Sequence, residues 1–177
     1  VLLLTIAGGL ATPAAASPPV AAVVTFQVTY APEVPQEART AFAASTAIWA
    51  ALLNSAVPIQ VRVTWTAGGD CSQACTLASA GPTDMVQNFP NAPRANTLYP
   101  IALANSLAGS KQNQGDDITA DFNSQANWDY GQGTPAAGKT SFIGTAVHEL
   151  AHGLGFSATL DYASGMGTFS ATPNIFD

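Results

Sequence analysis

The spacing of apolar residues predicts a strand, a helix and a strand in the first third of the chain. Residues 23–30 are rich in β-branched and aromatic side chains, and residues 59–65 alternate apolar with polar, as in a strand with one buried face. Between them, residues 36–54 are rich in alanine and place four residues on one continuous helical face. Those four residues are Phe42, Ser45, Trp49 and Leu52. We expect this face to pack on a sheet that contains both strands.

The pattern is less regular through the middle of the chain. Glycine, proline and asparagine dominate residues 67–115, which predicts irregular loops with one short helical turn near residues 102–107. Residues 117–123 alternate again and predict a strand, expected at a sheet edge where free amides could bind an extended peptide. A glycine-rich connection over residues 131–138 then leads into a helix that begins near Thr140. We therefore expect one α+β domain with a twisted mixed sheet.

The first residues predict export. Residues 1–10 form a short apolar run, and the small residues Ala14–Ala16 precede Ser17, where a signal peptidase would cut. The run is interrupted well before the roughly 20 apolar residues that a membrane-spanning helix needs. We expect residues 1–16 to be a secretory signal peptide truncated at its start, with a buried strand as the alternative. Residues 17–177 are expected to be one secreted domain that continues past the last residue.

Composition narrows the classes of function. The 177 residues include 5 Lys and Arg against 11 Asp and Glu, which gives a net charge of −6. So few cations cannot form the basic stripe that nucleic-acid binding or polybasic membrane attachment requires. Hydrophobic residues make up 47% of the chain, enough to build a core. The chain has two histidines, so any histidine-based chemistry must use His148 and His152.

The two cysteines predict a local disulfide. Cys71 and Cys75 are four residues apart, and an exported protein meets an oxidising compartment. A zinc site on this pair is the alternative, but the pair supplies only two ligands and no histidine is close in the sequence. Closing so short a loop stabilises a fold by about 1–3 kcal/mol.

The predicted last helix carries the pattern His-Glu-x-x-His at His148, Glu149 and His152. On a helix that turns about 100° per residue, the two imidazoles lie about 40° apart and can bind one metal ion. Glu149 lies about 100° from His148, where its carboxylate can act on a water without being a metal ligand. The opposite side is apolar and is expected to anchor the helix in the core. Its residues are Ile143, Val147, Leu150 and Leu154. A core helix with two structural histidines is the alternative.

This motif resembles that of the zincin superfamily of zinc metallopeptidases, and more narrowly that of metzincin-like secreted enzymes with His-Glu-x-x-His-x-x-Gly. Gly155 matches the final glycine, at which the helix of those enzymes ends so that the chain can reverse. Residues 77–82, 88–93 and 121–124 also look like stretches of a group of exported, mostly bacterial zincin-like proteins. The resemblance covers most of residues 20–177. It implies a zincin-like catalytic domain with a zinc cofactor and a protein or peptide substrate.

The motif leaves the third zinc ligand open. Metzincins place a His or Asp three residues beyond the glycine, where this chain has Ala158. Asp161 and Asp177 are the remaining candidates, and a gluzincin-like arrangement would place an acidic ligand farther downstream. Met166 is a candidate for a Met-turn, with ordinary core packing as the alternative.

The resemblance implies peptide hydrolysis by metal-activated water. Zinc held by His148, His152 and a third side chain would lower the pKa of its water towards about 7, and Glu149 would act as the general base. Tyr130 or Tyr162 could donate a hydrogen bond to the oxyanion, with packing as the alternative. Two other functions stay open: a secreted zincin-like binding or cell-surface module without turnover, and a purely structural zinc site. The sequence does not indicate substrate specificity or oligomeric state.

Overall fold

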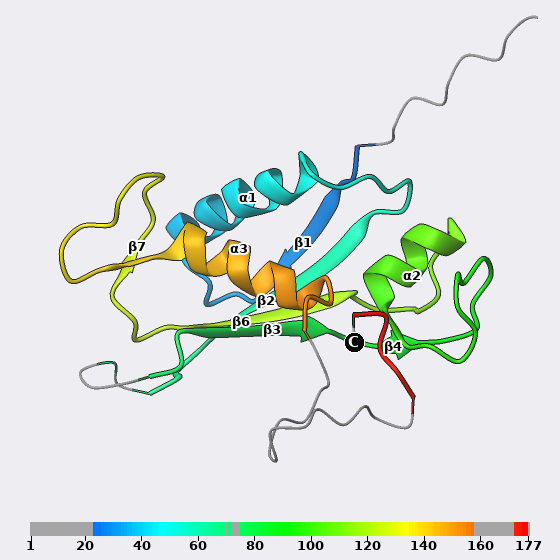
Figure 1. Ribbon diagram of the computed structural model, residues 1–177. Helices are drawn as coiled ribbons and strands as arrows, with labels where there is room; N and C mark the ends of the chain where they lie inside the picture. Colours follow the sequence, from blue (N-terminus) through cyan, green and yellow to red (C-terminus); the bar gives the residue numbers. More distant parts are fainter. Residues whose placement is uncertain (1–22, 70, 72–74, 158–171, 177) are drawn as a thin grey trace, which may run out of the picture.

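The computed structural model describes residues 23–69, 71, 75–157 and 172–176 of the chain. Within these ranges the chain forms an α+β domain with three helices and a mixed sheet. In chain order the elements are β1 (Phe26–Tyr30), α1 (Gln36–Ala50), β2 (Ile59–Thr66), β3 (Ala78–Pro82), β4 (Met85–Val86), β5 (Tyr99–Pro100), α2 (Ile101–Ala108), β6 (Ile118–Asn123), β7 (Trp128–Asp129), β8 (Thr140–Ser141) and α3 (Phe142–Gly153). Figure 1 shows α1 and α3 side by side over one face of the sheet, with α2 beyond the C-terminal end of α3.

The strand, helix and strand predicted at the start of the chain are confirmed. β1 and β2 pair in parallel, with Val28 opposite Val61, and α1 connects them. Along β2 the predicted alternation is also present, since Val61 and Val63 are fully buried while Arg62 is exposed. The apolar side of this strand therefore faces the helices.

The helix α1 is shorter than predicted. It begins at Gln36 as expected but ends at Ala50, about one turn early. Phe42 and Ser45 on the predicted face are buried, whereas Leu52 is 70% exposed because it lies in the turn after the helix. Helical spacing identified the buried face correctly only as far as the helix continues.

The strand predicted over residues 117–123 is confirmed as β6, but its predicted position at a sheet edge is wrong. The four-stranded sheet has the order β1-β2-β6-β3, so β6 pairs in parallel with β2 on one side and antiparallel with β3 on the other. Its residues Ile118, Ala120 and Phe122 are at most 1% exposed, as expected for a central strand covered by helices. Among the described residues, β3 is the strand at this edge of the sheet, next to β6. Its sequence Ala-Ser-Ala-Gly-Pro lacks the β-branched and aromatic residues that favour strands, so this segment was predicted to be loop.

Aromatic rings join α1 and α3 to the sheet. The ring centroids of Phe122 on β6 and Phe142 at the start of α3 lie 4.6 Å apart. Trp128 packs edge-on against Phe142 at 5.2 Å, and Phe42 of α1 packs edge-on against Phe122 at 5.9 Å. Because aromatic side chains bury large areas, this cluster fixes the beginning of α3 on the sheet.

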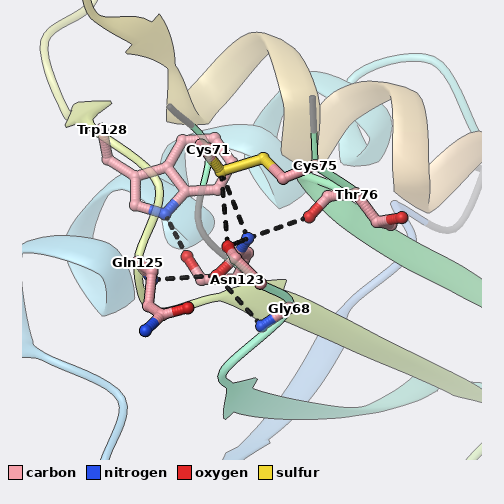
Figure 2. The surroundings of a disulfide bond; sticks show 8 residues. Gly68, Cys71, Cys75, Thr76, Asn123, Gln125 and Trp128 are labelled. Carbon is pink, nitrogen blue, oxygen red and sulfur yellow. Dashed lines mark hydrogen bonds between the residues drawn. A yellow bond between two sulfur atoms is a disulfide. The ribbon is translucent and has the colours of Figure 1, made fainter. Parts of the chain in front are cut away.

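The predicted disulfide between Cys71 and Cys75 is confirmed. Figure 2 shows it beside Asn123, whose side-chain amide donates to Cys71 Sγ at 3.3 Å. The side-chain oxygen of Asn123 accepts the backbone N–H of Gly68 at 3.1 Å. Since Asn123 is the last residue of β6 and is 2% exposed, one buried amide ties the disulfide loop to the sheet.

Two further helix predictions are confirmed. The helical turn expected near residues 102–107 is α2, and the helix expected from about Thr140 is α3. The predicted signal peptide, residues 1–16, lies outside the described residues. Within the described ranges, none of the helices has the length and apolar character needed to span a bilayer.

Candidate metal site

The helix α3 carries all three residues of the predicted motif, and its first turn is capped. The Ser141 hydroxyl oxygen accepts the backbone N–H of Gly144 at 3.1 Å. The Thr145 hydroxyl donates to the Ser141 carbonyl at 2.9 Å. The cap satisfies an amide that the first helical turn leaves unpaired. The position of the helix start is therefore set by both this cap and the aromatic cluster.

The core face of α3 is rotated from the predicted one. The fully buried residues at a spacing of four are Phe142, Ala146 and Leu150. Leu154, just after the helix, is also buried, so the prediction is confirmed for Leu150 and Leu154. Ile143 is partly buried and packs against the core cluster, as predicted, whereas Val147 is only half-buried. The carbonyls of both residues accept hydrogen bonds from α1, so α1 packs along this side of the helix.

Two hydrogen bonds from α1 hold the outer side of α3. The Ser45 hydroxyl donates to the Ile143 carbonyl at 3.3 Å, and the Trp49 indole N–H donates to the Val147 carbonyl at 3.1 Å. Both acceptors are backbone atoms, so these bonds position the helix itself. The second acceptor belongs to the residue immediately before His148.

The two motif imidazoles converge at their Nε2 atoms, which lie 3.1 Å apart. Their rings are nearly perpendicular, with centroids separated by 4.7 Å. Two nitrogen ligands bound to one tetrahedral zinc at 2.0–2.1 Å would lie about 3.3 Å apart. The separation between His148 and His152 therefore fits two ligands of one metal ion. A hydrogen bond between the two neutral rings has a similar distance.

The tautomer of His152 follows from its second contact. Its Nδ1 lies 3.0 Å from the backbone carbonyl oxygen of Phe156. A carbonyl oxygen can only accept a hydrogen bond, so Nδ1 carries the proton and Nε2 of the neutral ring keeps its lone pair. Metal-binding histidines usually have such a partner on the nitrogen that does not bind the metal. The donor set and its outer contact thus both fit a zinc ligand.

Gly155 allows the chain to turn back towards His152 after α3. Its φ is +101°, in the left-handed region that side chains disfavour. A Cβ at this position would lie 2.4 Å from Pro100 Cγ and 2.9 Å from a ring carbon of Phe176. The predicted role of this glycine in ending the helix and reversing the chain agrees with its conformation. The next residue is Phe156, whose carbonyl holds His152.

The Glu149 carboxylate lies on a different side of α3 from the exposed His148 imidazole. Glu149 is 8% exposed. Its position in the helix places it about 100° around the axis from His148. Glu149 is thus a buried acidic residue that directly follows one of the two converging imidazoles in the sequence.

Among the described residues, no His, Cys, Asp or Glu joins the pair to make a cluster of three that could hold a metal ion. The candidate third ligands Asp161 and Asp177 lie outside the described residues. Ala158, Tyr162 and Met166 also fall in an undescribed segment. The described site therefore consists of two imidazoles, one carboxylate and their supporting contacts.

Tyr130 lies at the opposite end of α3 from His152. Its ring packs against Phe142, with 5.4 Å between centroids, and Phe142 precedes His148 by roughly 9 Å along the helix axis. Burial raises the pKa of Tyr130, and the negative charge of Glu37 raises it further. These contacts support a packing role for Tyr130.

The supporting contacts of the site were not predicted. The Phe156 carbonyl has no sequence signal, because any residue offers the same backbone oxygen. Trp49 was predicted on a buried helical face, but its contact with the residue before His148 depends on how α1 crosses α3. Only the tertiary arrangement could identify either one.

A family model described as SPBPB7E8-like matches residues 20–165, which include the whole motif helix. No curated protein matches the chain.

Proposed function

The chain belongs to the SPBPB7E8-like family, and we propose that it is a secreted zinc-dependent endopeptidase. In this proposal His148 and His152 bind the metal and Glu149 is the general base. The observation that carries it is the 3.1 Å separation of the two Nε2 atoms, together with the contact of His152 Nδ1 with the Phe156 carbonyl, which leaves the Nε2 lone pair for a metal.

Each side chain has a separate chemical task. A bound zinc ion would act as a Lewis acid: it would polarise the scissile carbonyl and lower the pKa of a bound water to about 7. His148 and His152 would bind the metal through their Nε2 atoms, and the Phe156 carbonyl keeps the proton of His152 on Nδ1. Glu149 accepts a proton from the attacking water and later delivers it to the leaving amine.

The fold supports a zincin-like catalytic domain. The motif helix α3 packs beside the edge strand β3 of a mixed sheet, and the long helix α1 supports its other side. An extended substrate would pair with β3 by adding a strand, since β6 has a neighbour on both sides. Protein and peptide substrates present such an extended backbone.

Secretion is part of the same proposal. The disulfide between Cys71 and Cys75 is of the kind that persists in oxidising compartments. It agrees with the signal peptide predicted for residues 1–16. Extraction of the mature protein from a culture supernatant, with N-terminal sequencing, tests this part directly.

Replacing the proposed base is the decisive experiment for catalysis. The Glu149→Gln variant should bind zinc with the stoichiometry of the wild-type protein while kcat/KM on an unfolded protein substrate falls about 100-fold to 10,000-fold. Glu33→Gln, a change at an exposed glutamate before α1, is the matched control and should leave hydrolysis unchanged. His148→Ala should lose both zinc and activity.

Three results would contradict the proposal in different ways. Full turnover by Glu149→Gln would reject Glu149 as the base. Stoichiometric zinc in a wild-type protein that cleaves no substrate would favour a binding module or a structural zinc site. A wild-type protein that binds no zinc would reject the metal site itself.

A further inference from the structure

The segment that contains both histidines is held by one side chain from another helix. Trp49, on α1, donates its indole N–H to the carbonyl of Val147, the residue before His148. The same indole stacks on the ring of Phe156, with centroids 5.9 Å apart and an interplanar angle of 29°. Phe156 in turn offers its carbonyl to His152. Trp49 therefore contacts the chain next to one histidine and next to the hydrogen-bond partner of the other.

Phe156 needs such support because of where it lies. It follows Gly155, whose left-handed conformation takes the chain out of the helix. Its side chain is 52% exposed, so burial alone does not fix its orientation. Two rings flank it, since Trp49 stacks on it and the ring of Phe176 lies 5.3 Å away. The backbone N–H of Phe156 donates to the Ala151 carbonyl at 2.9 Å, and the aromatic cluster outside α3 adds a second restraint on this residue.

We propose that Trp49 is a positioning residue of the metal site. It holds Phe156 so that its carbonyl keeps the His152 proton on Nδ1, and it fixes the α3 backbone at Val147 so that the two Nε2 atoms stay close. This inference rests on the proposed function, because it gives Trp49 a role through the zinc-binding histidines. A positioning role differs from a purely structural role, in which Trp49 would pack against the core without affecting the histidines.

The test separates the two contacts that Trp49 makes. Trp49→Phe keeps a ring that can stack on Phe156 but has no N–H, and Trp49→Leu removes both contacts. We expect Trp49→Leu to weaken zinc binding, measured by competition with a chelator, by about 10-fold to 100-fold, the usual effect of losing an outer contact of a metal ligand. Trp49→Phe should lose less affinity than Trp49→Leu.

A stability-matched control and a metal-free measurement complete the design. Val34→Ala removes buried side-chain volume ahead of α1 and should lower stability without changing zinc affinity. In metal-free protein, nitrogen NMR of the neutral His152 ring should show the Nδ1–H tautomer in the wild type. In Trp49→Leu it should show a mixture of tautomers, because the Phe156 carbonyl loses the restraint that the stacked indole adds.

The outcomes distinguish this inference from the proposed function. Wild-type zinc affinity and an unchanged tautomer in Trp49→Leu would overturn the role of Trp49 while leaving the metal site intact. An equal loss of zinc affinity in Val34→Ala would also overturn it, because general destabilisation would then explain the effect. If the wild-type protein binds no zinc, the proposed function fails, and the tautomer of His152 still shows whether Trp49 orients this ring.

Discussion

At the scale of single residues, Gly155 occupies a position where the backbone conformation and the space around it both disfavour a side chain. Its positive φ is strained for other residues, and the space where a Cβ would lie is filled by Pro100 and Phe176. A substitution here must therefore distort the backbone, shift these neighbours, or both. Because the next residue supplies the carbonyl that orients His152, the site is sensitive to this distortion.

Gly155→Ala is expected to lower the free energy of unfolding by about 1–3 kcal/mol, the usual cost of a strained backbone conformation. Urea denaturation of the full chain measures the change. Gly133→Ala is the matched control, because nothing lies within 4 Å of its Cβ and its φ is outside the positive range. It should change stability by no more than about 0.5 kcal/mol. Equal effects of the two substitutions would contradict the explanation.

At the scale of elements, a loop closed by one carboxylate leads into α3. Asp129 ends β7, and its side chain accepts the backbone N–H groups of Ala136 and Gly131, each at 2.9 Å. These hydrogen bonds lower the pKa of Asp129 below its ordinary value, and the bond from Ala136 has the larger effect. The ionised carboxylate therefore gives the loop after β7 its shape, in place of regular secondary structure.

The lowered pKa of Asp129 predicts a pH dependence of folding. Since the pKa is lower in the folded protein than in the unfolded chain, the carboxylate stabilises the fold above its unfolded pKa. This contribution is lost as the pH falls through the folded pKa. Thermal unfolding between neutral and acidic pH should show a shallower fall of Tm below about pH 4 in Asp129→Asn than in the wild type. Parallel curves for the two proteins would show that this carboxylate does not contribute.

At the scale of the whole molecule, an ion pair between the buried Asp117 and the partly exposed Lys111 joins the segment around α2 to the sheet. Asp117 is fully buried, and its Oδ1 accepts from Lys111 Nζ at 2.6 Å and from the Asn105 side chain at 2.8 Å. Its Oδ2 accepts the backbone N–H of Gln60 on β2 at 2.8 Å. One carboxylate thereby connects α2, the loop after it and the start of β2.

Breaking this pair should destabilise the protein far more than breaking the exposed pair beside it. Lys111→Met leaves the Asp117 charge buried without its cation, and is expected to cost about 3 kcal/mol of unfolding free energy. Arg62→Met removes the neighbouring pair with Asp116, whose arginine side chain is 55% exposed, and should cost at most about 1 kcal/mol. Chemical denaturation of both variants gives the comparison. A smaller cost for Lys111→Met than for Arg62→Met would show that the ion pair of Asp117 contributes little.

Much of the domain could be predicted because its signals are local. The alternation in β2, the helical face of Phe42 and Ser45, and the helix that carries His148 and His152 all depend on residues close together in the chain. The spacing of Cys71 and Cys75 was equally local, and their disulfide was predicted correctly.

The errors arose where a residue's environment depends on distant segments. β3 has a weak strand sequence and forms because it pairs with β6, which also makes β6 a central strand. Val147 has the right spacing for a core face, but it is only half-buried where α1 packs beside α3. Long-range pairing and helix crossing are properties of the assembled fold, so no local pattern records them.

The candidate metal site divides in the same way. The sequence by itself determined the types and spacing of the histidines and Glu149, because a helix of fixed pitch converts that spacing into proximity. The turn after α3 brings the Phe156 carbonyl to His152, and the tertiary structure decided the contact of Trp49 with both ends of the site. The contacts of Trp49 join residues about a hundred positions apart, so they form only when α1 and α3 pack together, whereas Phe156 is only four residues from His152.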